Sequence, residues 1–97
     1  MPTKRVSTNG TLRLVLYVAG DAPNSRAAVA NINAICAGHF AAAHEIEIID
    51  LLDDPERALT DGIFVTPTLI KLSPPPTQRM IGNLSDTRQV LLALRNK

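Results

Sequence analysis

The 97-residue sequence holds one cysteine, one tyrosine, two phenylalanines and no tryptophan. A lone cysteine, Cys36, cannot form a disulfide within the chain. Three aromatic side chains are too few to build the stacking platforms on which single-stranded nucleic acids bind. The sequence therefore argues against a disulfide framework and against a nucleic-acid-binding module, and its core must be built from leucine, isoleucine, valine and alanine.

The sequence also has no large excess of charge and no long apolar run. Ten lysines and arginines nearly balance nine acids, which disfavours binding to nucleic acids or membranes. No apolar stretch approaches the roughly 20 residues that cross a bilayer, and no secretion signal is present at the N-terminus. We expect a soluble, cytoplasmic protein with no membrane or nucleic-acid partner.

The charges that are present are unevenly distributed along the chain. The N-terminal end is basic, with Lys4, Arg5 and Arg13. The middle carries seven acids against a single base, Arg57. These acids are Glu45, Glu47, Asp50, Asp53, Asp54, Glu56 and Asp61. The default explanation of such a run of acids is a solvated face of the protein. A charged docking surface is the more specific alternative.

Chain length and the first ten residues define the expected domain organisation. Residues 1–10 are polar and contain Asn9-Gly10, which predicts a flexible N-terminal tail. Residues 11–97 suit one domain whose core is thin, so that self-association would add stability. No internal repeat divides this stretch.

The first half of the domain has a strand, helix, strand pattern. Leu12 to Val18 has apolar residues on both faces, as in a central strand. After Pro23, apolar residues recur at helical spacing, and Gly38 is a plausible end of that helix. Their stripe consists of Val29, Ile32, Ile35, Cys36 and Phe40. Glu45 to Leu51 alternates as a half-buried strand, and a right-handed crossover would make the two strands parallel.

The second half is divided by prolines and glycines. Asp53 to Glu56 predicts the start of a short helix that ends before Gly62. Pro67 opens a third strand, and its peptide bond could be cis or trans. A spacer of prolines from Pro74 to Pro76 leads to an antiparallel strand over residues 77–82.

A final helix is predicted to begin at Asp86. Ser85 is its candidate N-cap, and its buried stripe is Val90, Leu91 and Leu94. The resulting order, βαβαββα with a proline opening the third strand, is that of an α/β thioredoxin-like domain.

Redox chemistry is nevertheless not expected. In the thioredoxin-like architecture, the loop before the first helix normally carries a cysteine pair, whereas this loop reads Ala22-Pro23-Asn24-Ser25. Thiol exchange needs an attacking thiolate and a second sulfur. Cys36 lies more than two helical turns away, at an apolar position typical of a core residue.

No other catalytic, cofactor or metal site is predicted. His39 and His44 would leave a zinc ion two ligands short. Ser25 and Ser85 are better explained as helix caps than as nucleophiles, and the acids near Asp50 do not follow a calcium-loop spacing. We therefore interpret the chain as a binding module and not as an enzyme.

Several ordered motifs resemble the KaiB family of circadian clock proteins, over a stretch from about Leu12 to Leu94. The motifs are Leu16-Tyr17-Val18-Ala19-Gly20, Pro23-Asn24-Ser25, Ile49-Asp50-Leu51, Asp54-Pro55, Thr66-Pro67-Thr68-Leu69, the prolines to Pro76, Arg79, Ile81-Gly82 and Leu84-Ser85-Asp86. The resemblance implies a non-enzymatic regulator that binds a KaiC-type hexameric ATPase and kinase and modulates its phosphorylation or timing cycle. KaiA-like or histidine-kinase regulators, and self-association to a dimer or tetramer, are further implied partners; no cofactor is implied.

The resemblance also implies two folds for one sequence. KaiB proteins exchange a tetramer-forming βαββααβ ground state for a thioredoxin-like monomer, which is the form that KaiC binds. The expected fold-switch residues are Pro67, Pro76, Asn83, Ala93 and Arg95. Alanine at position 93 favours helix over glycine by about 1 kcal/mol, and Arg95 complements the helix dipole by about 0.3 to 1 kcal/mol. We hypothesise that both residues favour the thioredoxin-like form.

The expected partner-binding residues are Arg26, Glu47, Lys71 and Arg79. Glu47 stands where KaiB proteins often carry a lysine, whereas Lys71 keeps a basic position. A charge reversal on a docking surface lowers affinity or selects another partner.

Two alternative functions remain from the sequence. One is a thioredoxin-like enzyme that uses a thiol cofactor such as glutathione through the Pro67 loop, although it would lack its own cysteine pair. The other is a detached sensor domain like that of clock histidine kinases, which we expect less because the sequence reaches Lys97 without a kinase segment.

Overall fold

The computed structural model describes residues 11–40 and 44–95, and the predicted tail over residues 1–10 lies outside them. Seven elements follow one another in the order βαβαββα, which confirms the predicted order. They are β1 (Leu12–Val18), α1 (Pro23–His39), β2 (His44–Asp50), α2 (Glu56–Asp61), β3 (Thr68–Ser73), β4 (Gln78–Ile81) and α3 (Thr87–Arg95).

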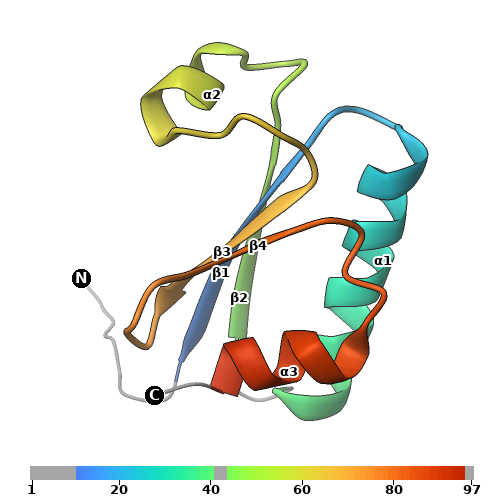
Figure 1. The fold of residues 1–97 in the computed structure, drawn as a ribbon, viewed down its shortest axis with the longest axis vertical. Coiled ribbons are helices and arrows are strands. Elements are labelled where there is room, and N and C mark those ends of the chain that lie inside the picture. The colour runs from blue at the N-terminus through green and yellow to red at the C-terminus, as the bar shows by residue number, and fades with distance from the viewer. Residues whose placement is uncertain (1–10, 41–43, 96–97) are drawn as a thin grey trace.

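The four strands form one mixed sheet in the order β2-β1-β3-β4 (Figure 1). Strand β1 pairs in parallel with β2, as predicted, and antiparallel with β3, which in turn pairs antiparallel with β4. Because β1 lies inside the sheet, both of its faces need cover. Helices α1 and α3 contact each other and lie against one face, while α2 lies at one end of the sheet.

The main core lies between the sheet and helices α1 and α3. Alternate residues of β1 point into it, among them Leu14 and Leu16. Helix α1 contributes Ile32 and Cys36, both fully buried. Burial raises the pKa of the Cys36 thiol to about 11, so the side chain behaves as a small apolar residue. The prediction that Cys36 belongs to the core is confirmed.

A smaller core lies on the opposite sheet face, which we call the open face. Its buried members are Val15, Tyr17, Ile49, Ile63 and Ile70. Ile63 comes from the segment that follows α2 and is the only member from outside the sheet. Within residues 11–40 and 44–95, the cover of the open face therefore lies at the end that carries α2 (Figure 1).

The ends of two helices differ from the sequence prediction. Helix α1 continues through Gly38 to His39, and the Phe40 N–H closes it on the Cys36 carbonyl at 2.8 Å. The N-cap of α3 is Asp86 and not Ser85, because Asp86 Oδ1 accepts the Gln89 N–H at 3.2 Å. Both side chains can cap a helix, so composition alone could not choose between these neighbours.

Pro67 lies immediately before β3, which begins at Thr68. The structure places the Thr66–Pro67 peptide bond in cis, as it does the bonds before Pro74 and Pro76. Pro67 is buried, and its carbonyl accepts the Gly82 N–H at 3.0 Å. The residue thus connects the start of β3 to the end of β4.

Gly62 ends α2 in the left-handed conformation, with φ of 71°. This turn lets the Ile63 N–H reach the Ala58 carbonyl at 2.8 Å and directs Ile63 into the smaller core. A Cβ at position 62 would meet no atom within 4 Å. Glycine is therefore required at position 62 because of the backbone conformation, and not because a side chain would clash with neighbouring atoms.

We expect Gly62→Ala to lower the free energy of unfolding by about 1 to 2 kcal/mol, the cost of a left-handed residue with a Cβ. Gly38→Ala is the matched control. A Cβ there also meets no atom within 4 Å, but Gly38 is helical, so alanine should stabilise by up to about 1 kcal/mol. Urea denaturation of both variants measures the difference, and equal shifts of the same sign would contradict it.

Candidate protein-interaction site

The open face presents a row of four residues, one from each strand. Val15 pairs with Glu47 on one side and with Ile70 on the other, and Ile70 pairs with Arg79. Paired residues in adjacent strands point to the same face. The row therefore has a carboxylate on edge strand β2, two apolar residues in the middle and a guanidinium on edge strand β4.

The charged ends of this row are accessible and the middle is not. Glu47 and Arg79 are exposed, whereas Val15 and Ile70 are buried. At the usual strand spacing of about 4.8 Å, the backbones of the two charged residues lie roughly 14 Å apart. A protein surface can span that distance, and opposite charges at its two ends would fix the orientation of a bound partner.

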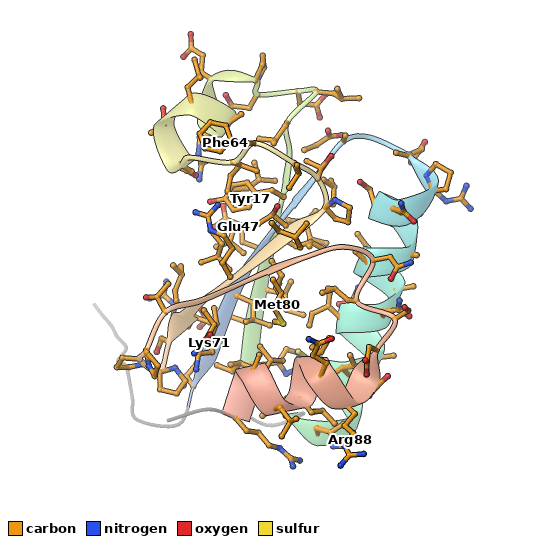
Figure 2. The ribbon with its side chains drawn as sticks, viewed as in Figure 1. Tyr17, Glu47, Phe64, Lys71, Met80 and Arg88 are labelled. Atoms are coloured by element: carbon orange, nitrogen blue, oxygen red, sulfur yellow. The ribbon has the colours of Figure 1, made fainter. Side chains whose placement is uncertain are left out.

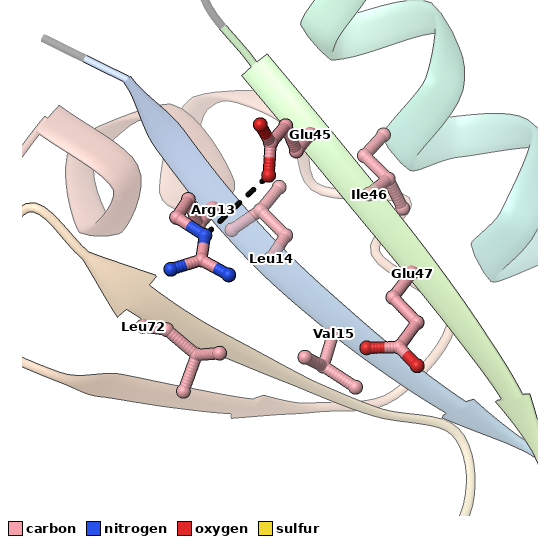
Figure 3. A pocket seen from close by; sticks show the side chains of 7 residues that line it. All are labelled: Arg13, Leu14, Val15, Glu45, Ile46, Glu47 and Leu72. Carbon is pink, nitrogen blue, oxygen red and sulfur yellow. Dashed lines mark ion pairs between the residues drawn. The ribbon is translucent and has the colours of Figure 1, made fainter. Parts of the chain in front are cut away.

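A hollow of about 180 Å³ lies beside this row on strands β1, β2 and β3 (Figure 3). Arg13 and Glu45 form an ion pair across it, with Nε and Oε1 3.4 Å apart. Both side chains are more than half exposed, so the pair contributes little to stability. Its charges therefore remain available to a partner, as does the carboxylate of Glu47 on the same wall.

A three-membered polar cluster closes the other end of the open face. The Tyr17 hydroxyl donates to Asp61 Oδ2 at 2.7 Å, and Arg57 Nε donates to the same oxygen at 3.1 Å. Arg57 Nη2 also lies 3.1 Å from this oxygen, in an ion pair. Tyr17 belongs to β1, whereas Arg57 and Asp61 belong to α2. The cluster thus attaches α2 to the central strand.

The contacts of this cluster shift the pKa of each of its members. Burial, together with the hydrogen bond to Asp61, raises the pKa of Tyr17. The hydrogen bond from Tyr17, with the hydrogen bond and the charge of Arg57, lowers the pKa of Asp61, and the hydrogen bond to Asp61 raises the pKa of Arg57. At pH values above 3.8, the ordinary pKa of an aspartate, the ionised Asp61 therefore stabilises the fold. This contribution is lost as the pH falls through the lower pKa that Asp61 has in the folded protein.

The four expected partner-binding residues lie in three different places. Glu47 and Arg79 share the open face, and Arg79 Nη1 also donates to the Gly62 carbonyl at 3.0 Å. Arg26 is exposed on α1, on the other side of the sheet. Lys71 is fully buried on the helix-covered face (Figure 2), and burial lowers its pKa. The prediction that Lys71 contacts a partner requires a surface position, and in this form its side chain is buried.

The expected fold-switch residues lie along the second half of the chain. The Asn83 carbonyl accepts a hydrogen bond from Asn31 of α1 at 2.8 Å, and Asn83 Oδ1 accepts the Ser85 N–H at 3.0 Å. Ala93 is partly buried in α3, and Arg95 is exposed in its last turn. Pro67 and Pro76 each follow a cis bond. Their role in switching stays a prediction.

The Tyr17–Asp61–Arg57 cluster was missed by the sequence analysis. Arg57 and Asp61 are four residues apart, and this spacing on a helix does indicate an ion pair. Tyr17, however, lies 44 residues before Asp61, and no local pattern joins them. The contact depends on where α2 docks, which only the tertiary structure shows.

The first turn of α1 holds a structural hydroxyl where a thioredoxin carries sulfur. Ser25 is buried, and its Oγ accepts the Ala19 N–H at 3.1 Å. The only thiol of the chain, Cys36, is buried farther along α1. The chain thus combines a thioredoxin-like fold and a single, buried thiol with exposed charges across one sheet face.

Comparison with known sequences identifies the family. The KaiB domain profile matches residues 15–96. Circadian clock protein KaiB3 of Synechocystis sp. is 49% identical over 81 residues, covering 84% of this chain and 79% of the relative. The circadian clock oscillator protein KaiB of Prochlorococcus marinus (strain MIT 9211) is 43% identical over 89 residues, covering 92% and 78%. The chain belongs to the KaiB family, and this membership makes it a non-catalytic regulator and not a thiol enzyme.

Solved structures agree on the fold. The N-terminal domain of Synechococcus elongatus SasA matches with a TM-score of 0.74 and 25% identity, over 100% of this chain and 95% of that domain. Fasciola hepatica thioredoxin matches with a TM-score of 0.69 and 20% identity, over 92% and 84%. The thioredoxin-like prediction is confirmed. Within residues 11–40 and 44–95, no helix has the length and apolar character needed to cross a membrane.

Tyr17 is the sole tyrosine and there is no tryptophan, so an alkaline absorbance titration reports this hydroxyl alone. We expect a midpoint above 10.0, because burial and Asp61 favour the neutral phenol. Asp61→Asn should move the midpoint back toward 10.0, since it removes the carboxylate acceptor and its charge. Asp53→Asn, an exposed acid outside the cluster, serves as the control. A midpoint at or below 10.0 in the folded wild-type protein would contradict the cluster.

Proposed function

We propose that this protein binds a KaiC-type hexameric ATPase and kinase, and modulates its phosphorylation or timing cycle. Family membership is the observation that carries the proposal. The chain itself supplies no second sulfur for thiol chemistry, and its exposed charges suit recognition of another protein. KaiA-like or histidine-kinase regulators are proposed as further partners; the likeness to the SasA domain supports a place among clock proteins.

The open face supports this proposal because its charges are exposed but held in fixed places. Glu47 stands on a paired strand, and Arg79 is anchored by its bond to Gly62. Residues positioned in this way lose little conformational entropy on binding. We propose Glu47 and Arg79 as contacts on this face and Arg26 as a contact on α1. Lys71 is left out because it is buried in this form.

We further propose that the thioredoxin-like arrangement is a major state of the protein in solution. Helix α3 carries Ala93 in its interior and Arg95 in its last turn, and both favour helix in this segment. Gly62 adds a third contribution, because it adopts the left-handed turn without the cost that any other residue would incur there. Exchange with a βαββααβ form, together with association to a dimer or tetramer, completes the proposal.

Size-exclusion chromatography with light scattering tests the partner. We expect this protein to co-elute with the KaiC homologue encoded in the same genome, with ATP present. Arg79→Glu should weaken binding at least about tenfold, because a reversed charge at a docking surface costs more than a lost contact. Arg88→Glu is the control, since Arg88 is exposed on α3 and away from the open face (Figure 2). Absence of co-elution for the wild type would refute the proposal.

Nuclear magnetic resonance tests the fold state. We expect helical chemical shifts across residues 87–95 in the wild-type protein. Ala93→Gly should shift the population away from this form by roughly fivefold, which corresponds to about 1 kcal/mol of helix propensity. Ala30→Gly makes the same change on the exposed side of α1, which both arrangements share, and should leave the ratio unchanged. Strand-like shifts across residues 85–94 would overturn the proposed state.

A further inference from the structure

The hollow on strands β1, β2 and β3 combines an apolar floor with charged sides. Val15 lies at its floor and is 6% exposed, and Leu72 forms one side and is 47% exposed. Figure 3 shows the carboxylate of Glu47 on the side opposite Leu72, with Val15 between them. The strand order accounts for this arrangement, because β1 lies between β2 and β3 and each strand contributes one of the three residues. The hollow is therefore apolar along its floor and one side, and carries a carboxylate on the other.

The charges around the hollow leave one carboxylate without a counter-charge. Arg13 and Glu45 neutralise each other in the ion pair at 3.4 Å. The carboxylate of Glu47 forms no hydrogen bond or ion pair within the part of the chain that the structure describes. The backbone of Arg79 lies roughly 14 Å from that of Glu47, and its guanidinium donates to a carbonyl of the segment after α2. Arg57, at the end that carries α2, is paired within that helix. The local charge of the hollow is therefore negative at Glu47.

The volume of the hollow limits what can occupy it. At about 180 Å³, it is smaller than the roughly 300 to 1,000 Å³ of sites that enclose small molecules. A single side chain of a protein partner suits this size better. Lysine and arginine have an apolar stem and a cationic end. The stem would lie on Val15 and Leu72, and the cationic end would meet Glu47.

We propose that the hollow receives one lysine or arginine side chain of the ATPase partner, and that Glu47 is the residue that selects it. This inference rests on the proposed function and adds to it the chemistry of one contact. Strand β2 holds Glu47 in place through its pairing with β1, so little conformational entropy is lost on binding. The incoming cation would also lie near Glu45, whose ion pair with Arg13 is exposed and therefore easily rearranged.

The same features disfavour most other occupants. An acidic side chain or a phosphate group would bring a second negative charge to Glu47. Anionic membranes and nucleic acids would be disfavoured at this position for the same reason. A second copy of the chain could place one of its own exposed arginines in the hollow, and the test therefore also measures self-association.

The test measures binding of the KaiC homologue from the same genome, with ATP present, by surface-immobilised kinetics at low and at high salt. The wild type is compared with Glu47→Gln, Glu47→Lys, Leu72→Ala and the control Asp21→Asn. Asp21 is exposed in the loop before α1 and does not line the hollow, so the control removes an acid elsewhere. Circular dichroism checks that each variant is folded, as expected for changes at exposed positions, and light scattering reports its state of association.

We expect Glu47→Gln to weaken binding by about tenfold at low salt and by less at high salt, because salt screens the lost attraction. Glu47→Lys should weaken binding further, since it places two cations together. Leu72→Ala should cause a several-fold loss that is similar at both salt concentrations, because its contact with the stem is apolar. Asp21→Asn should bind like the wild type.

Wild-type binding with unchanged affinity in Glu47→Gln, or tighter binding by Glu47→Lys, overturns this inference and leaves the proposed function standing. Absence of wild-type binding refutes the proposed function, and this inference with it. Loss of self-association in Glu47→Gln, with unchanged affinity for the ATPase, would assign the hollow to a second copy of the chain and so overturn the inference as well.

Discussion

The burial of β1 on both of its faces is the constraint on which the other elements depend. Six of its seven residues are buried, with only Arg13 exposed. One side is covered by α1 and α3, which provide continuous apolar stripes. The other side has no long helix in the described residues 11–40 and 44–95, so its cover comes from neighbouring strands, from Ile63 and from the docking of α2. The sheet is thus closed on one face and accessible on the other.

Helix α2 is placed by tethers and not by its own core. It has only six residues, which are too few for a stable isolated helix, and none of them is buried. Its position depends on Tyr17 from β1, on the left-handed turn at Gly62 and on Arg79 from β4. This arrangement fixes a short helix while leaving Leu59 exposed on its outer surface.

Periodicity predicted what depends on local sequence, namely the order of the elements, the parallel pair and the buried stripe around Ile32 and Cys36. It could not predict which residues share a face across β3 and β4. A shift of one residue in register exchanges the two faces of a strand, and the observed register places Lys71 on the helix-covered face and its neighbour Ile70 on the open face. The row from Glu47 to Arg79 and the Tyr17–Asp61 contact depend on that register and on where α2 docks, and neither is encoded in a short window of sequence.

The Tyr17–Asp61 hydrogen bond makes the intrinsic fluorescence of the protein sensitive to its conformation. With no tryptophan and a single tyrosine, the intrinsic emission excited at wavelengths that phenylalanine does not absorb originates from the ring that holds α2 against the sheet. A carboxylate that accepts the phenolic proton quenches tyrosine emission, and release of that carboxylate restores it. Lifting of α2 from β1, whether during folding, refolding of the second half or complex formation, would therefore change the emission of the unlabelled protein.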